Sequence, residues 1–266
     1  MKPLILITND DGIRSPGLAA AAGAAADLAD ILIAAPHIQQ TGMGRAFPRT
    51  EDAGIIEEEW IQVNGHEVKG YGVHGSPAVA VAHGVLELAG RKPDLCISGI
   101  NYGENMGAVL TCSGTLGAAF EAVSHGIPAI AVSLEAELAI QRSNDFRETD
   151  WNASKKMLHS WISRVLDKGM PEYTDLLNIN VPAGSKYSDE FRITSLSRQN
   201  YFEFIKPKAR DLKKPFALES RLSVDLDSLE KDSDIYAVFV DRITSVTPIN
   251  MNMSIGLREV MLDKYM

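Results

Sequence analysis

Short apolar runs recur along the first half of the chain, and segments typical of helices separate them. The runs "LILIT" (4–8), "DILIAAP" (30–36), "DLCISGI" (94–100) and "AIAVSL" (129–134) have the continuous apolar character of strands that are buried on both faces. Strands that alternate with helices predict an α/β fold, a Rossmann-like and mainly parallel sheet with helices on both faces. Further strands are expected at 66–73 and 176–182, and helices at 16–29, 76–89, 115–126 and 151–169.

Past about residue 135 this alternation weakens. The stretches 192–211 and 222–248 alternate with period two, which indicates hairpin or edge strands, and 255–265 is compatible with a short terminal helix. No internal repeat or low-complexity linker divides the chain. We therefore expect a single domain over 1–266, with a core at about 1–135 and 151–182 and a C-terminal β-hairpin and helix extension at about 190–266.

The net charge limits the kinds of ligand the chain could bind, and the cysteines and apolar runs indicate its location. The net charge of -9 comes from 26 basic and 35 acidic residues, which argues against binding of long nucleic acid. A small phosphorylated ligand remains possible, because one metal ion reverses the local field. Cys96 and Cys112 lack zinc-type spacing and are expected to be reduced thiols. The opening apolar stretch is too short for a signal peptide and no run could span a bilayer, so we expect a cytoplasmic protein.

Polar segments follow the expected strands where these end. Asp10 and Asp11 come directly after the first strand, and a tight turn at Gly12 would let both carboxylates face one point. Two like charges repel each other there, and a hard divalent cation would remove the repulsion. The oxygens of Thr41 and Asn101, after two other strands, are neutral ligands for such an ion. The pattern therefore predicts a site for Mg²⁺ or Mn²⁺ at one edge of the sheet.

Each of these segments taken singly also has a plain structural interpretation. Asp-Asp-Gly is commonly a solvated turn, and "TGMG" (41–44) lacks the third glycine of a dinucleotide fingerprint, with Phe47 in its place. The segment "SGT" (113–115) is a good helix cap, although a helix N-terminus is also an anion site. Their gathering on one sheet edge favours the functional interpretation.

Other chemistries find less support. The chain has no G-x-S-x-G elbow and no P-loop. Its six histidines show no metalloprotease spacing, and most are expected at the surface or the edge of the core. His37 and His74 lie close to predicted strand ends and remain candidates for a functional role.

Several segments together resemble the SurE family of stationary-phase survival proteins, which are metal-dependent 5'/3'-nucleotidases. The resemblance rests on "TNDDGIRSPGL", "APHIQQTGMG", "SGINYGENMG", "SGTLGAAFEA" and "LNINVP", with "SDIYAVFVDRITSVTPI" matching the closing strand and Thr-Pro signature. These segments run in the family's order from residue 4 to about 249. The set is highly specific, whereas its single pieces are not.

The resemblance implies a Rossmann-like core whose C-terminal hairpin is exchanged between the subunits of a homodimer or homotetramer. It implies one divalent metal ion per subunit, held by residues matching Asp10, Asp11, Thr41 and Asn101. It also implies hydrolysis of phosphomonoesters, chiefly nucleoside monophosphates, as by the 5'-nucleotidase class (EC 3.1.3.5).

This chain departs from the family pattern at three places. Thr41 stands where the family usually has Ser, which keeps the hydroxyl but adds a methyl group. The helix start "TPADC" is "SPAVA" (76–80) here and loses its acidic residue, and Ile249-Asn250 follows Thr247-Pro248 where many members carry Asp and His. Which group acts as the general acid or base is therefore left open.

The expected mechanism is attack of a metal-activated water on a phosphomonoester. Asp10 or Asp11 could accept a proton, and hydrogen-bond donors would stabilise charge on the phosphate. Base and sugar contacts are expected from 43–60 and from the partner subunit, without a ranking of nucleotides. We expect catalytic roles for Asp10, Asp11 and Asn105, and substrate contacts from Asn9, Gly42, Gly99, Asn105, Ser113, Gly114 and Thr115.

Three alternatives compete with this mechanism. A receiver-like Mg²⁺-binding module needs a phospho-accepting Asp after its third strand and a lysine after its fifth, but the chain has Ser98-Gly99-Ile100-Asn101 and Glu135 there. A haloacid-dehalogenase-type phosphatase needs a D-x-D pair, whereas Asp10 and Asp11 are adjacent. A non-catalytic nucleotide-binding module would retain its ligand and release no phosphate.

Overall fold

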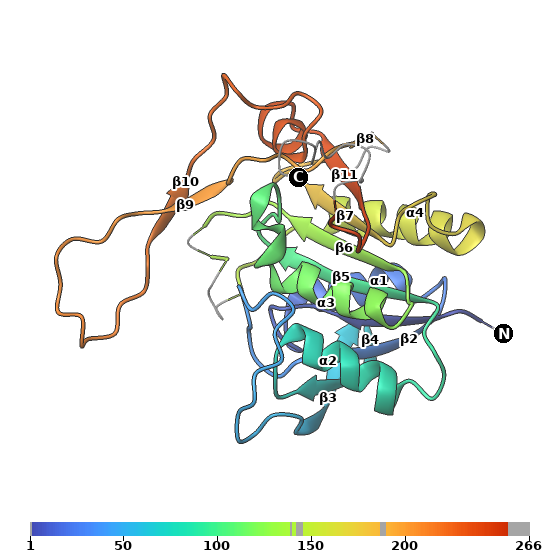
Figure 1. The fold of residues 1–266 in the computed structure, drawn as a ribbon. Helices are drawn as coiled ribbons and strands as arrows, with labels where there is room; N and C mark the ends of the chain where they lie inside the picture. The colour runs from blue at the N-terminus through green and yellow to red at the C-terminus, as the bar shows by residue number, and fades with distance from the viewer. Residues whose placement is uncertain (1, 139, 142–145, 187–189, 255–266) are drawn as a thin grey trace, which may run out of the picture.

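A nine-stranded, mostly parallel sheet forms the centre of the molecule, in the strand order β3-β4-β2-β1-β5-β6-β7-β11-β8 (Figure 1). The computed structural model describes residues 2–138, 140–141, 146–186 and 190–254. β1, β2, β4, β5, β6 and β7 run parallel, β3 and β11 pair antiparallel with β4 and β7, and β8 pairs parallel with β11. The strands are β1 Leu4–Thr8, β2 Asp30–Pro36, β3 Ile56–Val63, β4 His66–Val73, β5 Leu95–Tyr102, β6 Ala129–Leu134, β7 Leu176–Val181, β8 Phe191–Ile193, β9 Phe202–Phe204, β10 Ser220–Leu222 and β11 Thr244–Ile249.

Helices cover both faces of this sheet, so the expected α/β class and its buried parallel strands are confirmed. α1 and α4 pack on one face, and α2 and α3 pack on the other (Figure 1). None of the described helices is long and apolar enough to cross a membrane. The helices are α1 Pro16–Ala25, α2 Pro77–His83, α3 Gly114–Ser124 and α4 Asn152–Lys168, with single helical turns at Gly84–Leu88, Ala108–Thr111 and Tyr236–Val240.

Serine caps fix where three of these helices begin. The Ser15, Ser76 and Ser113 hydroxyls each accept a hydrogen bond from a backbone N–H of the first helical turn. Proline follows Ser15 and Ser76, where its missing N–H costs nothing. The three caps lie at one edge of the sheet, so each of these helices starts where parallel strands end.

β3 was not among the strands expected from the sequence. Base and sugar contacts from 43–60 stay a prediction. Residues 56–63 form a strand that pairs antiparallel with β4 through all eight positions. Asn64 and Gly65 join the two strands with φ of 49° and 83°, as in a two-residue hairpin turn. The Asn-Gly pair is therefore the sequence feature that indicates this hairpin. The three consecutive glutamates of β3 hide the apolar alternation that would otherwise indicate the strand.

The extension also differs from the expected alternating strands. Tyr236–Val240 is a helical turn, because the Ser233 hydroxyl accepts from Tyr236 N (3.2 Å) and Asp234 accepts from Ile235 N (2.8 Å). Only short strands form on either side of it. The terminal helix expected at 255–265 lies outside the described residues.

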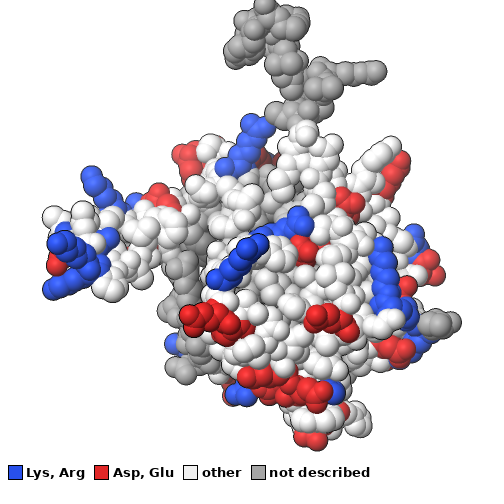
Figure 2. All heavy atoms as spheres, turned by 60° about the horizontal axis from the view of Figure 1, so that its bottom comes forward, with Lys and Arg blue, Asp and Glu red and all other residues white. Residues whose placement is uncertain are grey.

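β9 and β10 form a two-stranded arm that projects from the body (Figure 1). Residues 205–219 between the two strands are exposed and carry five basic and two acidic residues in a chain of net charge -9. In Figure 2 the arm extends to the left, and more blue than red is visible at its end. The arm also exposes large apolar side chains: Phe204, Leu212, Phe216, Leu218 and Leu222.

Candidate active site

Asp10 and Asp11 lie at the carboxyl end of β1 and are almost completely buried, with 3% and 2% of their surfaces exposed. The Asn9 side chain closes the turn that carries them: Oδ1 accepts from Gly12 N and Nδ2 donates to Gly12 O, both at 3.1 Å. Gly12 has φ of +100°, which glycine adopts without strain. The turn expected at Gly12 is confirmed. The Asn9 amide, expected to contact phosphate, is engaged in that turn.

Burial makes both carboxylates costly to ionise. Desolvation raises the pKa of Asp10, although the hydrogen bond from Thr115 opposes it. Desolvation also raises the pKa of Asp11, and the neighbouring charge of Asp10 raises it further. No Lys or Arg within the described part of the chain forms an ion pair with either group. Two adjacent buried carboxylates without a basic partner fit a divalent cation, which would supply the missing positive charge.

The start of α3 holds the Asp10 side chain in place. The Thr115 hydroxyl is fully buried and donates to Asp10 Oδ1 at 2.6 Å. Gly114 is required beside it, because a Cβ at this position would come within 2.7 Å of Asp10 Cβ. The Ser113 hydroxyl caps the helix by accepting from Leu116 N at 3.2 Å. In this structure residues 113–115 position Asp10 and begin the helix, and the expected phosphate contacts of these residues stay a prediction.

The loop after β2 packs directly on the carboxylate turn. Gln40 N donates to Asp10 O at 2.7 Å, and Gln39 Nε2 lies 3.5 Å from Asp11 Oδ1. Thr41 follows these residues and is exposed, so its hydroxyl is accessible. The loops after β1 and β2 thus lie together, as the sequence predicted. No feature of the sequence indicates the contact between Gln39 and Asp11.

Asn101 lies near the end of β5 and is buried, with 8% of its surface exposed. Its Nδ2 donates to Gly103 O at 2.6 Å, which leaves Oδ1 as the side-chain group available to a cation. The next residue, Tyr102, donates its backbone N–H to Asp11 Oδ2 at 3.1 Å. This backbone hydrogen bond from Tyr102 places the end of β5, and with it Asn101, beside the carboxylate pair.

Asn105 is held by polar side chains that the sequence analysis missed. Its Nδ2 donates to Ser133 Oγ (3.0 Å) and Thr115 Oγ1 (3.3 Å), and its backbone N–H donates to Asn180 Oδ1 (2.8 Å). Asn178 and Asn180 donate back to the Asn105 carbonyl at 2.8 Å and 3.2 Å. Ser133, Asn178 and Asn180 are fully buried in β6 and β7. These polar residues inside otherwise apolar strands are the sequence feature that could have indicated their role in holding Asn105.

Two buried acids anchor the loop that carries Asn105, and both escaped the sequence analysis. Burial raises the pKa of Glu104 to about 7, and its Oε2 accepts from Ala136 N at 3.2 Å. Asp234 accepts from Gly107 N at 2.8 Å and from Ser197 N at 3.0 Å. The extension that contains Asp234 therefore helps to position the site.

The two remaining predicted glycines differ in their surroundings. Gly99 is buried in β5 with φ of +138°, and a Cβ there would lie 2.2 Å from Val132 O, so close packing of β5 on β6 requires it. Gly42 has φ of +81°, but a Cβ there would meet nothing within 4 Å. Substrate contact by either residue stays a prediction.

The fold and this edge of the sheet define a class: α/β proteins in which buried carboxylates and amides gather beyond the carboxyl ends of parallel strands. The family described as "Survival protein SurE" matches residues 5–203, and the chain belongs to that family. A similar solved structure, titled as the crystal structure of the SurE protein from Aquifex aeolicus, has a TM-score of 0.73 and 28% identity, and the match covers 99% of both chains.

Curated relatives support the same family. A protein of Methanosarcina barkeri named 5'-nucleotidase SurE is 34% identical over 100% of this chain and 98% of its own length. A protein of Methanothermobacter thermautotrophicus with the same name is 42% identical over 80% of each chain. The resemblance inferred from the sequence motifs is thus confirmed.

Proposed function

We propose that this chain is a phosphomonoesterase that hydrolyses nucleoside monophosphates to nucleoside and phosphate, as a 5'-nucleotidase (EC 3.1.3.5) does. The buried Asp10-Asp11 pair without a basic partner is the observation that carries the proposal. Family membership and the printed name of the relatives, 5'-nucleotidase SurE, support it. The same comparisons favour an enzyme over a non-catalytic nucleotide-binding module.

One divalent ion, Mg²⁺ or Mn²⁺, would be held by Asp10, Asp11, Thr41 and Asn101. When bound, such an ion lowers the pKa of a water molecule and neutralises charge on phosphate. Carboxylate, hydroxyl and amide oxygens are the ligands that both metals prefer. Thr115 keeps Asp10 directed toward this site through the 2.6 Å hydrogen bond.

The substrate phosphate would bind beside Asn105, whose backbone and amide are already fixed by β6 and β7. Phosphate would take over one of the two amide hydrogen bonds, of which the one to Thr115 Oγ1 is the longer at 3.3 Å, while the bond to Ser133 Oγ would keep the amide in place. Asn105 would therefore act as a catalytic residue, with Ser133, Asn178 and Asn180 positioning it.

Phosphate release from a panel of nucleoside 5'- and 3'-monophosphates tests the function. We expect release with Mg²⁺ or Mn²⁺, loss of release with EDTA, and recovery when metal is added back, because the carboxylate pair then regains its cation. Nucleotide that is retained in equilibrium dialysis without phosphate release would indicate a binding module instead. A trapped acyl-phosphate would indicate haloacid-dehalogenase chemistry.

We also propose a homodimer or homotetramer assembled through the arm. The arm exposes apolar side chains such as Phe204 and Leu212, with 64% and 83% of their surfaces exposed, and its basic end complements a body of net negative charge. Exposed apolar clusters of this kind are typical of association surfaces. A cytoplasmic location stays a prediction, in line with the free Cys96 and Cys112.

Light scattering after size exclusion tests the assembly. We expect the parent to elute as a dimer or tetramer and Phe204→Ser with Leu212→Ser to shift toward the monomer, because the substitutions remove apolar contact area. Leu86→Ser is the matched control, since Leu86 is 71% exposed on the body of the molecule. A monomeric parent, or equal masses for the arm variant and the parent, would contradict the proposal.

A further inference from the structure

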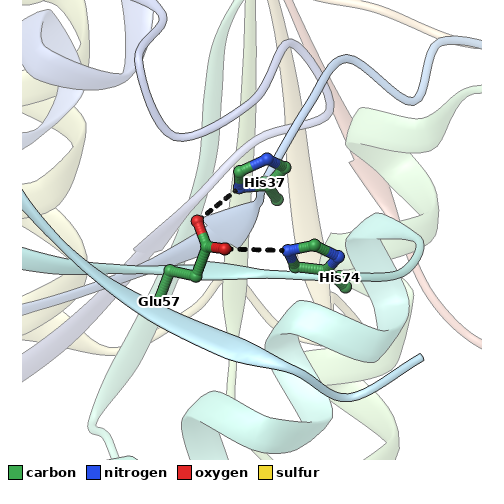
Figure 3. Close-up of side chains that lie close together, drawn as sticks. All are labelled: His37, Glu57 and His74. Atoms are coloured by element: carbon green, nitrogen blue, oxygen red, sulfur yellow. Dashed lines mark ion pairs between the residues drawn. The ribbon is translucent and has the colours of Figure 1, made fainter. Parts of the chain in front are cut away.

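A second cluster of metal-ligating side chains lies at the same edge of the sheet as the carboxylate pair, farther toward β3. His37 follows β2, His74 follows β4, and Glu57 is the second residue of β3. The backbone holds these positions together, because His37 N donates to Val73 O and His74 N donates to Ile55 O, both at 2.8 Å. Figure 3 shows the two imidazole rings facing the Glu57 carboxylate.

The three side chains present their ligand atoms to one small volume. His37 Nδ1 lies 3.1 Å from Glu57 Oε2, and His74 Nε2 lies 3.4 Å from Glu57 Oε1. One ligand atom from each residue lies within 4.8 Å of the other two. Bonds of about 2.0–2.2 Å at tetrahedral angles separate neighbouring ligand atoms by about 3.3–3.6 Å, close to the two ring-to-carboxylate distances. The rings are stacked with 23° between their planes, so one ring would rotate to bring both nitrogen lone pairs onto one Zn²⁺ ion.

The two ring nitrogens that face Glu57 are the atoms that a cation would bind. Both His37 Nδ1 and His74 Nε2 are buried atoms, and neither makes a well-directed hydrogen bond to a described residue. The rings are stacked with their centroids 4.3 Å apart, so charging both imidazoles would place two positive charges side by side. With Nδ1 of a neutral His74 ring donating to Asp52, Nε2 of that ring directs its lone pair at Glu57 Oε1, 3.4 Å away. A proton on Nε2 would relieve this contact, and so would a divalent cation, which would also bind His37 Nδ1 and the carboxylate.

Asp52 supplies the outer contact that such a site needs. Its Oδ2 lies 2.9 Å from His74 Nδ1 and accepts the proton of that nitrogen. This hydrogen bond leaves Nε2 of the same ring as the metal-binding nitrogen, and it makes that nitrogen a stronger ligand. A histidine that binds zinc commonly carries such a carboxylate on its other nitrogen.

We propose that His37, Glu57 and His74 form a second metal site, which takes Zn²⁺ or a similar borderline transition metal. Two imidazole nitrogens with one carboxylate oxygen suit Zn²⁺, Co²⁺ and Ni²⁺, whereas the oxygen-only set around Asp10 suits Mg²⁺ and Mn²⁺. Partial exposure of Glu57 and His37 leaves a position for water or an incoming ligand.

The ion would tie the β2 loop to the β3–β4 hairpin. His37 begins the loop whose Gln40 donates to Asp10 O and whose next residue is Thr41. The site is thus a clamp next to the proposed catalytic loop and is chemically distinct from it. Its existence does not depend on nucleotidase activity, because the ligands are different residues.

Isothermal titration calorimetry with Zn²⁺ tests the site, using metal-free Asp10→Asn/Asp11→Asn protein so that the carboxylate pair cannot contribute. We expect one Zn²⁺ per chain and at least about 30-fold weaker binding after His74→Ala or His37→Ala, because each removes one of three ligands. Asp52→Asn should weaken binding about 10–100-fold, the usual effect of losing an outer contact. Co²⁺ in place of Zn²⁺ should give the visible absorption of a low-coordinate ion, and His74→Ala should abolish it.

His83→Ala is the matched control. His83 also lies 2.9 Å from a carboxylate, that of Glu87, but belongs to no three-ligand cluster within the described residues. Glu57→Gln provides a further ligand variant whose size is unchanged, so a folding defect in a histidine variant leaves the test intact. No Zn²⁺ binding in the Asn double variant, or equal binding by the parent, His74→Ala and Glu57→Gln proteins, would overturn the proposal. Neither result would affect the proposed Mg²⁺-dependent phosphate release, because that activity depends on the carboxylate pair and not on these three residues.

Discussion

Replacing either member of the carboxylate pair with asparagine is expected to lower phosphate release by about 1,000-fold or more while leaving the fold intact. Asp10 and Asp11 supply both negative charges of the proposed metal site, and asparagine keeps their shape and one oxygen. The Thr115 hydroxyl can still donate to an asparagine at position 10, so the local structure should persist. Steady-state rates at saturating Mn²⁺, together with circular dichroism, check both parts.

The same variants should gain stability when no metal is present. Folding raises the pKa of both carboxyl groups above the ordinary value of 3.8, because the folded protein buries them. A carboxyl whose pKa is raised on folding favours the fold at low pH, and that contribution is lost as the pH rises above about 4. We therefore expect the unfolding temperature of the metal-free parent to fall between pH 5 and pH 8 relative to Asp10→Asn/Asp11→Asn.

Asp27→Asn is the matched control for both measurements. Asp27 is an exposed carboxylate that pairs with His159 at 3.1 Å, far along the sheet from the turn at Gly12. Its replacement should change neither phosphate release nor the response to Mn²⁺. Near-parental activity of both Asp10→Asn and Asp11→Asn would refute the proposed site.

The position of the site could be predicted from the sequence because apolar runs marked where the parallel strands end. Residues that directly follow such runs, such as Asp10 and Asn101, must meet at one sheet edge once the strand order is set. The hydrogen bond from Tyr102 N to Asp11 confirms this meeting of β1 and β5 across 91 positions of sequence.

The polar support of the site could not be predicted in the same way. Asn178 and Asn180 contact Asn105 across more than 70 residues, and no local pattern gives the register that aligns β7 with that loop. Thr115 looked like part of a helix cap, and only the packing of α3 on β5 and β6 brings its hydroxyl to Asp10. The register of the β-strands and the packing of the helices determine these contacts, and the conformational preferences of the individual residues do not.

β3 and the turn at Tyr236–Val240 show the limits of periodicity. Glu57, Glu58 and Glu59 interrupt the apolar alternation of β3, because this edge strand faces solvent on one side of the sheet. The apolar residues of 235–240 are compatible with a strand or with a helical turn. Ser233 and Asp234 favour the helical turn, because their side chains accept hydrogen bonds from its free N–H groups. The apolar period alone therefore does not decide between strand and helical turn.

Gly117→Ala is expected to lower phosphate release about 100-fold and to lower the free energy of unfolding as well. A Cβ at Gly117 would lie 2.1 Å from Gly44 O and 2.7 Å from Arg45 N, so the backbone of the 41–45 loop must move away. Thr41 lies on that loop, and a displacement of about 1 Å at a catalytic site commonly costs about 100-fold in rate. Alanine itself favours the helix by about 1 kcal/mol over glycine, which offsets part of the strain.

Gly23→Ala in α1 makes the same substitution without a backbone clash. The nearest atom to its Cβ is Asn64 Oδ1 at 2.6 Å, the end of a side chain that can rotate away. This variant should keep parental activity. If displacement of Thr41 causes the defect at Gly117, higher Mn²⁺ concentrations should recover part of the rate, because a weakened ligand set still binds metal at mass-action excess. The Asp10→Asn protein should show no such recovery, since it lacks the charge that holds the ion. A Gly117→Ala protein with parental activity and metal dependence would show that the position of the Thr41 loop does not matter to catalysis.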